Sequence, residues 1–370
     1  MRIKVALGLM VALLLAVALR HTVTGTVPLA KGETSDGRIT PPALHVPRRA
    51  QGASPPATQP SQAVEAVLLA AIEGETDPDR RSKALEDAAG SVSDADLPAM
   101  LDSLARDARP AAAELCQLLV RRWAEADAPS AAAWTAQLPD GSVRRAALEQ
   151  VAIAWANTDL PAATAWIQAM PAGESEQAAA VSLGYEAARS EPVTALSVAG
   201  ALPPGPQRDD LLVHAISQWA AGDSAVAADW AKKVPDVSLR ERLLAAVAVS
   251  SAEKEGAAAA TLAVNDLVTG EEQNRAVVSI VQRWAQNSPS AVASWVAQWP
   301  DTPARDAATQ NLLALWTGQD SQAAAAWLDG LPEGALRTTG VSAYSQALAD
   351  HDRSSATVLA GTLNSGYSSP

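Results

Sequence analysis

Few residues in this chain have the types and spacing that catalytic or metal-binding sites use. Histidine serves as a general base near neutral pH and as a metal ligand. The chain has four histidines: His21, His45, His214 and His351. His351 stands between Asp350 and Asp352, where a local ion pair or helix cap is favoured over a metal site, because a metal needs further convergent ligands. His214 lies well round a predicted helix from Trp219, so we expect a surface or partly buried residue there.

For the single cysteine and the paired carboxylates, the sequence also favours structural roles over catalytic ones. The only cysteine, Cys116, lies in the apolar segment AAAELCQLLV, which favours a buried small hydrophobic residue over a reactive thiol. The adjacent carboxylates Asp209 and Asp210, and Glu271 and Glu272, begin predicted helices, where negative charge interacts favourably with the helix dipole. No zinc-protease, nucleophile-elbow, phosphate-loop or paired-cysteine motif occurs. We therefore expect no catalytic residue, no cofactor and no metal.

Composition favours a folded body that carries a strong negative charge. The chain is 48% hydrophobic with a formal net charge of −13, which suits a packed core and disfavours a nucleic-acid partner. Residues 20–62 carry +3 and the first four residues carry +2, which leaves −18 on the chain from Ala63 onward. Solubility explains this acidity more simply than a specific basic ligand does.

The N-terminus predicts export. Arg2 and Lys4 precede an uncharged run over residues 5–19, which is typical of a signal peptide or an uncleaved anchor. Both alternatives stay open for residues 1–19, and contact with a membrane is expected only through residues 5–19 if they are not cleaved. Residues 20–62 are rich in proline, serine and threonine and predict a disordered linker. The expected location is periplasmic, inner-membrane-anchored or secreted.

The elements that must position any site come from an internal repeat. We call eight residues spaced by 32 or 33 the marker positions, and the residues eleven further on the partner positions. The markers are Trp123, Trp155, Ala187, Trp219, Ser251, Trp284, Trp316 and Leu348, and the partners are Trp134, Trp166, Val198, Trp230, Leu262, Trp295, Trp327 and Leu359. Ten of the eleven tryptophans occupy these positions, and Trp299 is the exception.

Each repeat predicts two helices separated by a cap. Short oxygen-bearing side chains stand four residues after a marker, as a helix N-cap requires. The predicted caps are Asp127, Asp159, Asp223, Ser288, Asp320 and Asp352. Prolines such as Pro129 and Pro161 follow them in the first helical turn. A longer helix therefore ends near each marker, and a shorter one begins after its cap.

Neither helix can bury its apolar face alone, so the hairpins are expected to stack. The fold class is all-α: a right-handed α-solenoid of stacked antiparallel helix pairs. The marker and partner tryptophans are the expected packing residues between alanine-rich helices. A row of aromatic residues for a carbohydrate or cation is the less favoured interpretation.

The segments WAQNSPSAVASWVAQWP and WTGQDSQAAAAWLDGLP carry a family resemblance. The chain from Trp123 to about Asn364 resembles the tandem αα-repeat arrays of the tetratricopeptide and HEAT class, in particular the alanine-rich W-A-x-x-D-P-x-A-A-x-W-L-x-x-L-P repeats of exported bacterial proteins. It lacks the tetratricopeptide Leu-Gly-x-x-Tyr and has 32 residues per repeat. The resemblance implies a helical scaffold that binds other proteins.

The expected organisation has three parts after the linker. Residues 63–122 are divergent helical hairpins that cap the array, residues 123–364 are eight αα repeats, and residues 365–370 are a disordered tail. Repeats three and five lack both tryptophans, through sequence drift or because they shape a bend. We expect a non-catalytic scaffold of the cell envelope or exterior with a protein or peptide partner. The alternative is an α-superhelical cell-wall enzyme of the glycosidase type, which needs a carboxylate buried in a cleft.

Overall fold

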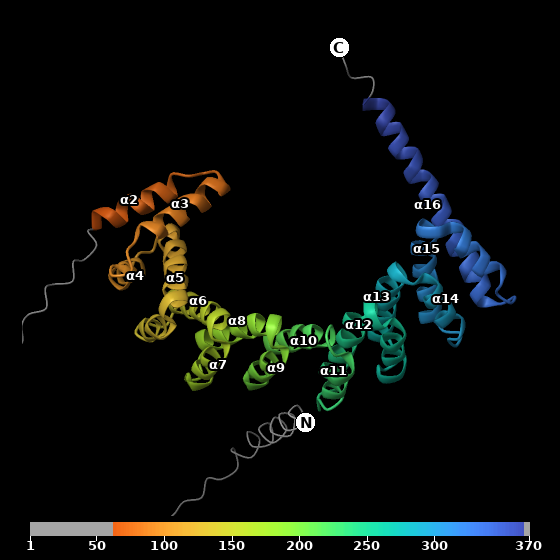
Figure 1. The fold of residues 1–370 in the computed structure, drawn as a ribbon, viewed down its shortest axis with the longest axis horizontal. Coiled ribbons are helices and arrows are strands. Elements are labelled where there is room, and N and C mark those ends of the chain that lie inside the picture. Colours follow the sequence, from red (N-terminus) through yellow and green to blue (C-terminus); the bar gives the residue numbers. More distant parts are fainter. Residues whose placement is uncertain (1–61, 366–370) are drawn as a thin grey trace, which may run out of the picture. The chain divides into compact units, whose positions relative to one another are not determined.

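A computed structural model describes the backbone of residues 62–365 and the side chains of residues 64–351. This part of the chain is all-helical and contains no strand. The helices (Figure 1) are α2 (Gln62–Glu73), α3 (Pro78–Ser91), α4 (Leu97–Leu104), α5 (Pro110–Thr135), α6 (Ser142–Thr158), α7 (Leu160–Ala169), α8 (Glu174–Ser190), α9 (Pro192–Ala201), α10 (Pro206–Ala220), α11 (Ser224–Ala231), α12 (Val237–Asp266), α13 (Glu271–Asn287), α14 (Pro289–Ala297), α15 (Pro303–Asp329) and α16 (Ala335–Ser365).

The long helices stack in chain order, as a helical repeat fold requires. α5 packs on α6, α6 on α8, α8 on α10, α10 on α12, α12 on α13, α13 on α15, and α15 on α16. The shorter helices α7, α9, α11 and α14 each pack on the long helix that precedes them. We call the helix that ends near a marker helix A and the one that follows helix B. The all-α helical expectation is confirmed, whereas the right-handed sense of the array stays a prediction.

One residue per repeat separates helix A from helix B. Four residues after seven of the markers, the backbone leaves helical geometry, with φ between −128° and −154° and ψ between 44° and 89°. These residues are Asp127, Asp159, Glu191, Asp223, Glu255, Ser288 and Asp320. In α5, α12 and α15 the turn lies inside one continuous helical assignment. The bend between helix A and helix B therefore occurs at the same position in all seven of these repeats.

Aspartate caps helix B through its own side chain. Asp159 accepts a hydrogen bond from the backbone N–H of Ala162 at 3.0 Å, and Asp223 accepts one from Val226 at 3.1 Å. Asp127 and Asp320 do the same with the third residue after each of them. Ser288 occupies the same backbone position without a side-chain cap. The bend therefore does not depend on the capping side chain alone.

Two cap positions escaped the sequence analysis, because glutamate is a poor N-cap residue. Glu191 and Glu255 make the same bend as the aspartates. Glu191 accepts a hydrogen bond from the Thr194 hydroxyl at 2.9 Å, and Glu255 accepts one from Ser224 in the preceding repeat. Both glutamates belong to the repeats that lack tryptophan.

The tryptophans lie between the two helices of each hairpin. Marker and partner rings lie 5.4 to 6.3 Å apart, centroid to centroid, in four repeats: Trp123–Trp134, Trp155–Trp166, Trp284–Trp295 and Trp316–Trp327. Trp134, Trp284 and Trp316 are buried, and the remaining marker and partner tryptophans, including Trp219 and Trp230, are partly buried. Trp299 lies against Trp295 at 4.7 Å. Large rings thus fill space that alanine side chains leave between the helices.

At five of the turns from a helix B to the next helix A, a polar side chain bonds the end of helix B. Eleven residues before a marker, it donates a hydrogen bond to the carbonyl six residues upstream, where helix B ends. The donors are Arg144, Arg240, Gln273, Arg305 and Arg337. Carbonyls at the end of a helix have no partner within that helix, so we call these five side chains the carbonyl clamps.

The last predicted hairpin is wrong in the structure. α16 runs through Asp352 as one straight helix (Figure 1), so Asp352 lies inside a helix and not at its N-cap. Leu348 and Leu359 replace the marker and partner tryptophans here, and no later helix of the described chain packs on α16. An aspartate four residues after a marker is therefore not sufficient by itself to bend the helix.

Several predictions about the termini lie outside the described residues. These are the signal peptide or anchor at residues 1–19, the linker over nearly all of residues 20–62, and most of the tail at residues 365–370. Among the helices that are described, none has the length and apolar character to cross a membrane. The segment 63–122, expected to form divergent helical hairpins, contains α2, α3, α4 and the first part of α5.

Candidate binding surface on helix A

The residues considered first for chemistry are scattered across the described chain. Cys116 is buried, and this burial raises the pKa of its thiol to about 12, so it is protonated at neutral pH. His214 is partly buried with its ring 5.0 Å from that of Tyr185, and His351 is exposed within α16. No group of three or more His, Cys, Asp or Glu side chains in the described residues is arranged to hold a metal ion.

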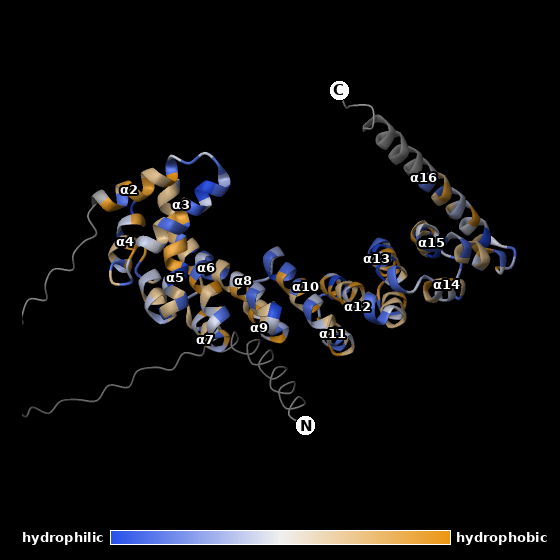
Figure 2. Cartoon of the chain, turned by 45° about the horizontal axis from the view of Figure 1, so that its top comes forward, coloured by the Kyte–Doolittle hydropathy of each residue, from blue (hydrophilic) through white to orange (hydrophobic). Residues whose placement is uncertain are grey.

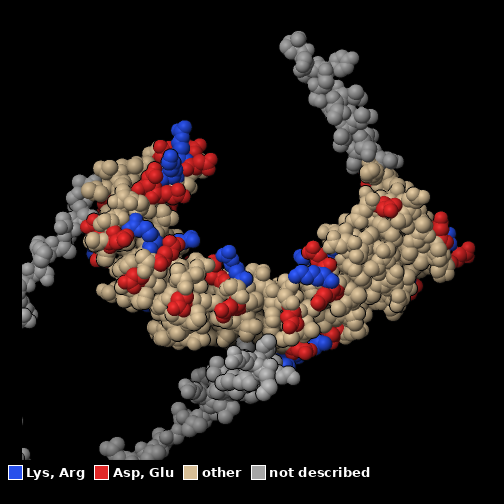
Figure 3. All heavy atoms as spheres, viewed as in Figure 1, with Lys and Arg blue, Asp and Glu red and all other residues tan. Residues whose placement is uncertain are grey.

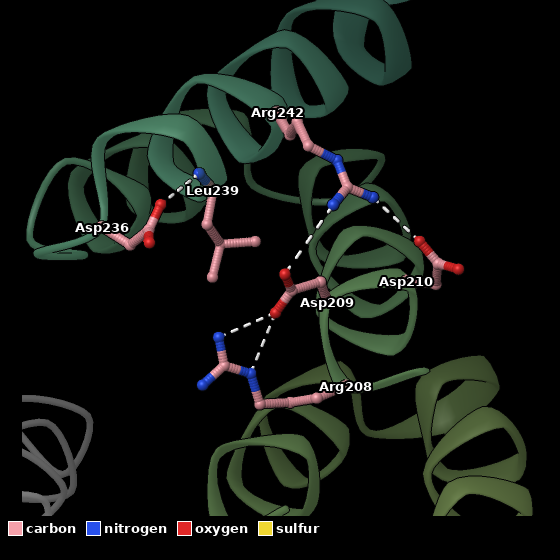
Figure 4. A network of polar contacts seen from close by, with 6 residues as sticks. All are labelled: Arg208, Asp209, Asp210, Asp236, Leu239 and Arg242. Atoms are coloured by element: carbon pink, nitrogen blue, oxygen red, sulfur yellow. Dashed lines mark hydrogen bonds and ion pairs between the residues drawn. The ribbon is translucent and has the colours of Figure 1, made fainter. Parts of the chain in front are cut away.

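One of the two carboxylate pairs, Asp209 and Asp210, connects neighbouring repeats, a role that the sequence did not indicate. Asp209 accepts hydrogen bonds from Arg208 at 2.9 and 2.7 Å, and Asp210 accepts one from Arg242 of α12 at 2.8 Å (Figure 4). Arg242 also lies 3.9 Å from Asp209. The pair therefore joins α10 to α12 as well as lying in the first turns of α10. Glu272 of the second pair forms an ion pair with Arg275 within α13.

Contacts between repeats recur with the period of the sequence. Arg144 donates to Glu176 at 2.5 Å, and the Trp134 indole N–H donates to Asp102 at 2.8 Å, each across 32 residues. Glu176 stands eleven residues before its marker, as Arg144 does before its own. Residues at the same repeat position therefore bind each other across two consecutive repeats. The first bond joins two consecutive helices A, α6 and α8, and the second joins helix B of the first repeat to α4.

One side of helix A is accessible in α8, α10 and α13. It consists of the residues nine, six, five and two positions before the marker, and we call it the helix A face. In α8 these are Ala178, Val181, Ser182 and Tyr185; in α10 they are Asp210, Val213, His214 and Ser217; in α13 they are Arg275, Val278, Ser279 and Gln282. All twelve are partly or fully exposed. Helices in this part of the chain show both hydrophilic and apolar sides (Figure 2).

On the helix A face, side chains 29 residues apart meet across successive helices. The Tyr185 ring of α8 lies 5.0 Å from the His214 ring of α10, centroid to centroid. Gln282 of α13 donates a hydrogen bond to Asn311 of α15 at 2.8 Å. The same spacing of 29 residues pairs Ser217 of α10 with Ala246 of α12, which lie between these two pairs in the sequence. The same register therefore brings a different pair of side chains together at each of these two places.

Three shallow cavities open along this face. One of about 340 Å³ is lined by Val181 and by the loop 202–208, and one of about 360 Å³ is lined by Val278 and its neighbours. A third, of about 590 Å³, lies between α15 and α16 and is lined by Gln310, Ala314 and residues of α16. Their linings are small, apolar or uncharged for the most part, which is suited to contact with another polypeptide.

A separate cavity of about 520 Å³ lies near the start of the described chain. It is lined by Glu65, Ser103, Arg106, Asp107 and Arg109 among others. Glu65 is the only buried carboxylate among the described residues and accepts a hydrogen bond from the Ser103 hydroxyl at 2.5 Å. The side-chain hydrogen bond from Arg109 lowers the pKa of Asp107, so that carboxyl is ionised near neutral pH.

Sequence reasoning directed attention away from the tryptophans but did not find these surface positions. Four of the five carbonyl clamps had a signal in the sequence, because arginine stands eleven residues before their markers, at 144, 240, 305 and 337. The helix A face gave no repeating signal in the sequence, because its residues differ from one repeat to the next. Glu65 belongs to α2 and Asp107 to the loop between α4 and α5, and only the fold brings them to one cavity.

Comparison with models of known protein families gave no match, and neither did comparison with curated proteins.

Proposed function

We propose that this protein is an exported, non-catalytic scaffold that binds a protein or peptide partner along its helix A face. The observation that carries the proposal is the row of facing pairs, of which Tyr185–His214 and Gln282–Asn311 have contacts in the structure. The packing residues repeat, whereas these accessible residues do not. Repeat arrays bind partners through surfaces of this kind, with a uniform frame and side chains that vary from copy to copy.

Chemistry along the helix A face supports recognition of an uncharged part of a partner. Half-exposed valines and small polar residues dominate the face in α8 and α10, with an aromatic pair at the centre. Tyrosine and histidine rings offer apolar area and hydrogen-bonding groups together, and aromatic residues are frequent at the energetic centre of interfaces. The charged residues Asp210 and Arg242 lie at one edge and bind each other.

The test is affinity capture from an envelope extract with the chain from Ala63 onward as bait. A matched set adds a helix A face variant, Tyr185→Ala with His214→Ala, and a control on helix B, Gln168→Ala with Val226→Ala. We expect a partner that the wild type and the control retain and the helix A variant loses. Loss from the control alone would move the binding surface to helix B.

The second candidate, a cell-wall hydrolase, has one observation in its favour. Glu65 is a buried carboxylate beside a cavity that also contains the ionised Asp107. Glycoside hydrolysis uses two carboxyl groups in different environments. If purified protein hydrolyses peptidoglycan and Glu65→Gln abolishes the activity while Glu114→Gln does not, this candidate replaces the scaffold.

A further inference from the structure

We propose that the turn between α9 and α10 holds a tryptophan side chain of the partner protein, an inference that rests on the proposed function. The observation is that the carbonyl clamp is missing at this turn. Arg208 stands eleven residues before its marker, as the clamping arginines do, but it donates to Asp209 and makes no bond to the Leu202 carbonyl six residues upstream. A cavity of about 340 Å³ opens at this turn, with Leu202 and Arg208 in its lining.

The sequence of the turn explains why Arg208 does not form the clamp. In two of the clamped turns, the arginine also pairs with a carboxylate four residues before it: Arg144 with Asp140 at 3.2 Å, and Arg305 with Asp301 at 2.6 Å. Four residues before Arg208 the chain has Pro204. Asp209 supplies the carboxylate instead, at 2.9 and 2.7 Å (Figure 4). This turn therefore keeps the arginine but lacks the carboxylate that holds the guanidinium near the carbonyl.

The turn offers a hydrogen-bond acceptor among apolar rings. Among the described residues, no backbone or side-chain group donates to the Leu202 carbonyl, and Leu202 is partly buried. Three of the five residues between Leu202 and Arg208 are prolines, which have no N–H to donate: Pro203, Pro204 and Pro206. Val181 of α8 lines the same cavity. A side chain that fits here brings a hydrogen-bond donor on an apolar body, because an acceptor removed from water without a donor costs free energy.

Tryptophan is the side chain that matches these requirements best. Its indole has one N–H donor, no acceptor and a large apolar ring. A carboxylate would bring only acceptors to the Leu202 carbonyl. A basic side chain would be repelled by the Arg208 guanidinium in the same cavity, whereas an aromatic ring interacts favourably with that cation. Tryptophan is also enriched at the energetic centre of protein interfaces.

The cavity continues the helix A face. Val181 belongs to the face in α8, and Tyr185, whose ring lies beside that of His214, follows it four residues later. This separation is about 6 Å along the helix, so one partner segment can contact both the cavity and the aromatic pair. Most of the surface visible in Figure 3 is uncharged, with acidic and basic side chains in small groups. An uncharged anchor suits such a surface better than an ion pair does.

The first test uses N-acetyl-tryptophanamide with a fluorinated indole as the probe, added to the full chain and followed by fluorine NMR line width. We expect a Kd of roughly 1 mM, because one side chain supplies little contact area. The same probe methylated on the indole nitrogen keeps the ring but has no donor, and it should bind about fivefold more weakly. Equal binding of the two probes, or no binding of either at several millimolar, would overturn the proposal.

Variants of the cavity test where the probe binds. Val181→Phe fills the cavity and should abolish binding, whereas Val226→Phe, at an exposed valine of α11, should leave the Kd unchanged. Pro204→Asp with Asp209→Asn gives this turn the carboxylate of the clamped turns and should weaken binding about fivefold, because the carbonyl then has its donor within the chain. If the probe binds Val181→Phe as tightly as it binds Val226→Phe, it does not occupy this cavity and the proposal fails.

Affinity capture distinguishes this inference from the function on which it rests. Loss of the captured partner by Val181→Phe, with retention by Val226→Phe, supports both. If neither probe binds the wild type while Tyr185→Ala with His214→Ala still loses a partner, the tryptophan site is wrong and the scaffold proposal stands. If the tryptophan probe binds with the expected selectivity and no partner is captured, the preference of the cavity stands and the scaffold proposal fails.

Discussion

Gly256 lies directly against the indole of Trp284. A Cβ added to Gly256 would overlap the Trp284 ring, and Trp284 is only 8% exposed. Gly256 begins helix B of the fifth repeat, which has no tryptophan of its own, and Trp284 is the marker of the sixth. Repeat five therefore has no tryptophan of its own, and its Gly256 leaves room for the Trp284 ring of repeat six.

Replacing Gly256 by alanine should lower stability despite alanine's better helix propensity. The added methyl group must displace the Trp284 ring or shift the backbone, which costs about 1–3 kcal/mol in a packed core. Gly318→Ala is the control, because that helical glycine has open space around it, and it should stabilise by about 0.5–1 kcal/mol. Urea unfolding of both variants measures the difference. A Gly256→Ala variant as stable as Gly318→Ala would refute the contact.

Loss of a carbonyl clamp should destabilise the array. Arg305 is 8% exposed, donates to the Trp299 carbonyl at 3.3 Å and pairs with Asp301 at 2.6 Å. Arg305→Met keeps most of the buried stem but leaves the carbonyl without a partner, at a cost of about 1–3 kcal/mol. Arg275→Met, which removes an exposed ion pair within α13, should change unfolding free energy by less than about 0.5 kcal/mol. Equal effects would mean that the clamp contributes no more than a surface charge.

The tryptophan pairs should show coupling in a double-mutant cycle. The rings of Trp155 and Trp166 lie 5.4 Å apart and both are partly buried. Each single change to leucine removes the ring contact, so the pair should couple by about 0.5–1.5 kcal/mol. The distant pair Trp166 and Trp316 should be additive. Additivity in the Trp155–Trp166 cycle would show that the rings act only by filling volume.

The cap at Asp127 should make stability fall in acid. Hydrogen bonds from the Ser130 side chain and backbone N–H hold the Asp127 pKa below its ordinary value. The stabilisation is therefore present above the ordinary carboxyl pKa and is lost as pH falls through the folded value. Asp127→Asn keeps an oxygen acceptor but does not titrate. Denaturant unfolding should show that the wild type is more stable than this variant at pH 7 and equally stable near pH 2. A difference in unfolding free energy that persists at pH 2 would mean that ionisation of Asp127 is not its cause.

Cys116 should be chemically silent until the chain unfolds. Burial raises its pKa to about 12, so both access and thiolate are lacking in the folded protein. A thiol reagent at pH 8 should label less than one tenth of Cys116 in the time that labels the unfolded chain fully in guanidinium chloride. Rapid labelling of folded protein would show that α5 opens readily near Cys116.

The sequence predicted the repeat closely because its landmarks act locally. Asp159 and Pro161 favour a helix start in any context, and tryptophan at a fixed period indicates a fixed packing site. Glu191 and Glu255 were not predicted as bend positions, because glutamate is a poor N-cap residue. Asp352 was predicted as a cap on the same local grounds, and the structure shows that the residue type alone does not bend the chain.

The amino-acid sequence alone determined the helical class, the length of the repeat and the positions of the tryptophans, since helix periodicity and capping depend on neighbours a few residues away. Only the tertiary structure decided which side of helix A remains accessible in α8, α10 and α13, and which side chains 29 residues apart meet there. Those properties depend on what the next repeat covers. Tyr185 and His214 have no local signal in common, and they come together only because α8 and α10 stack in register.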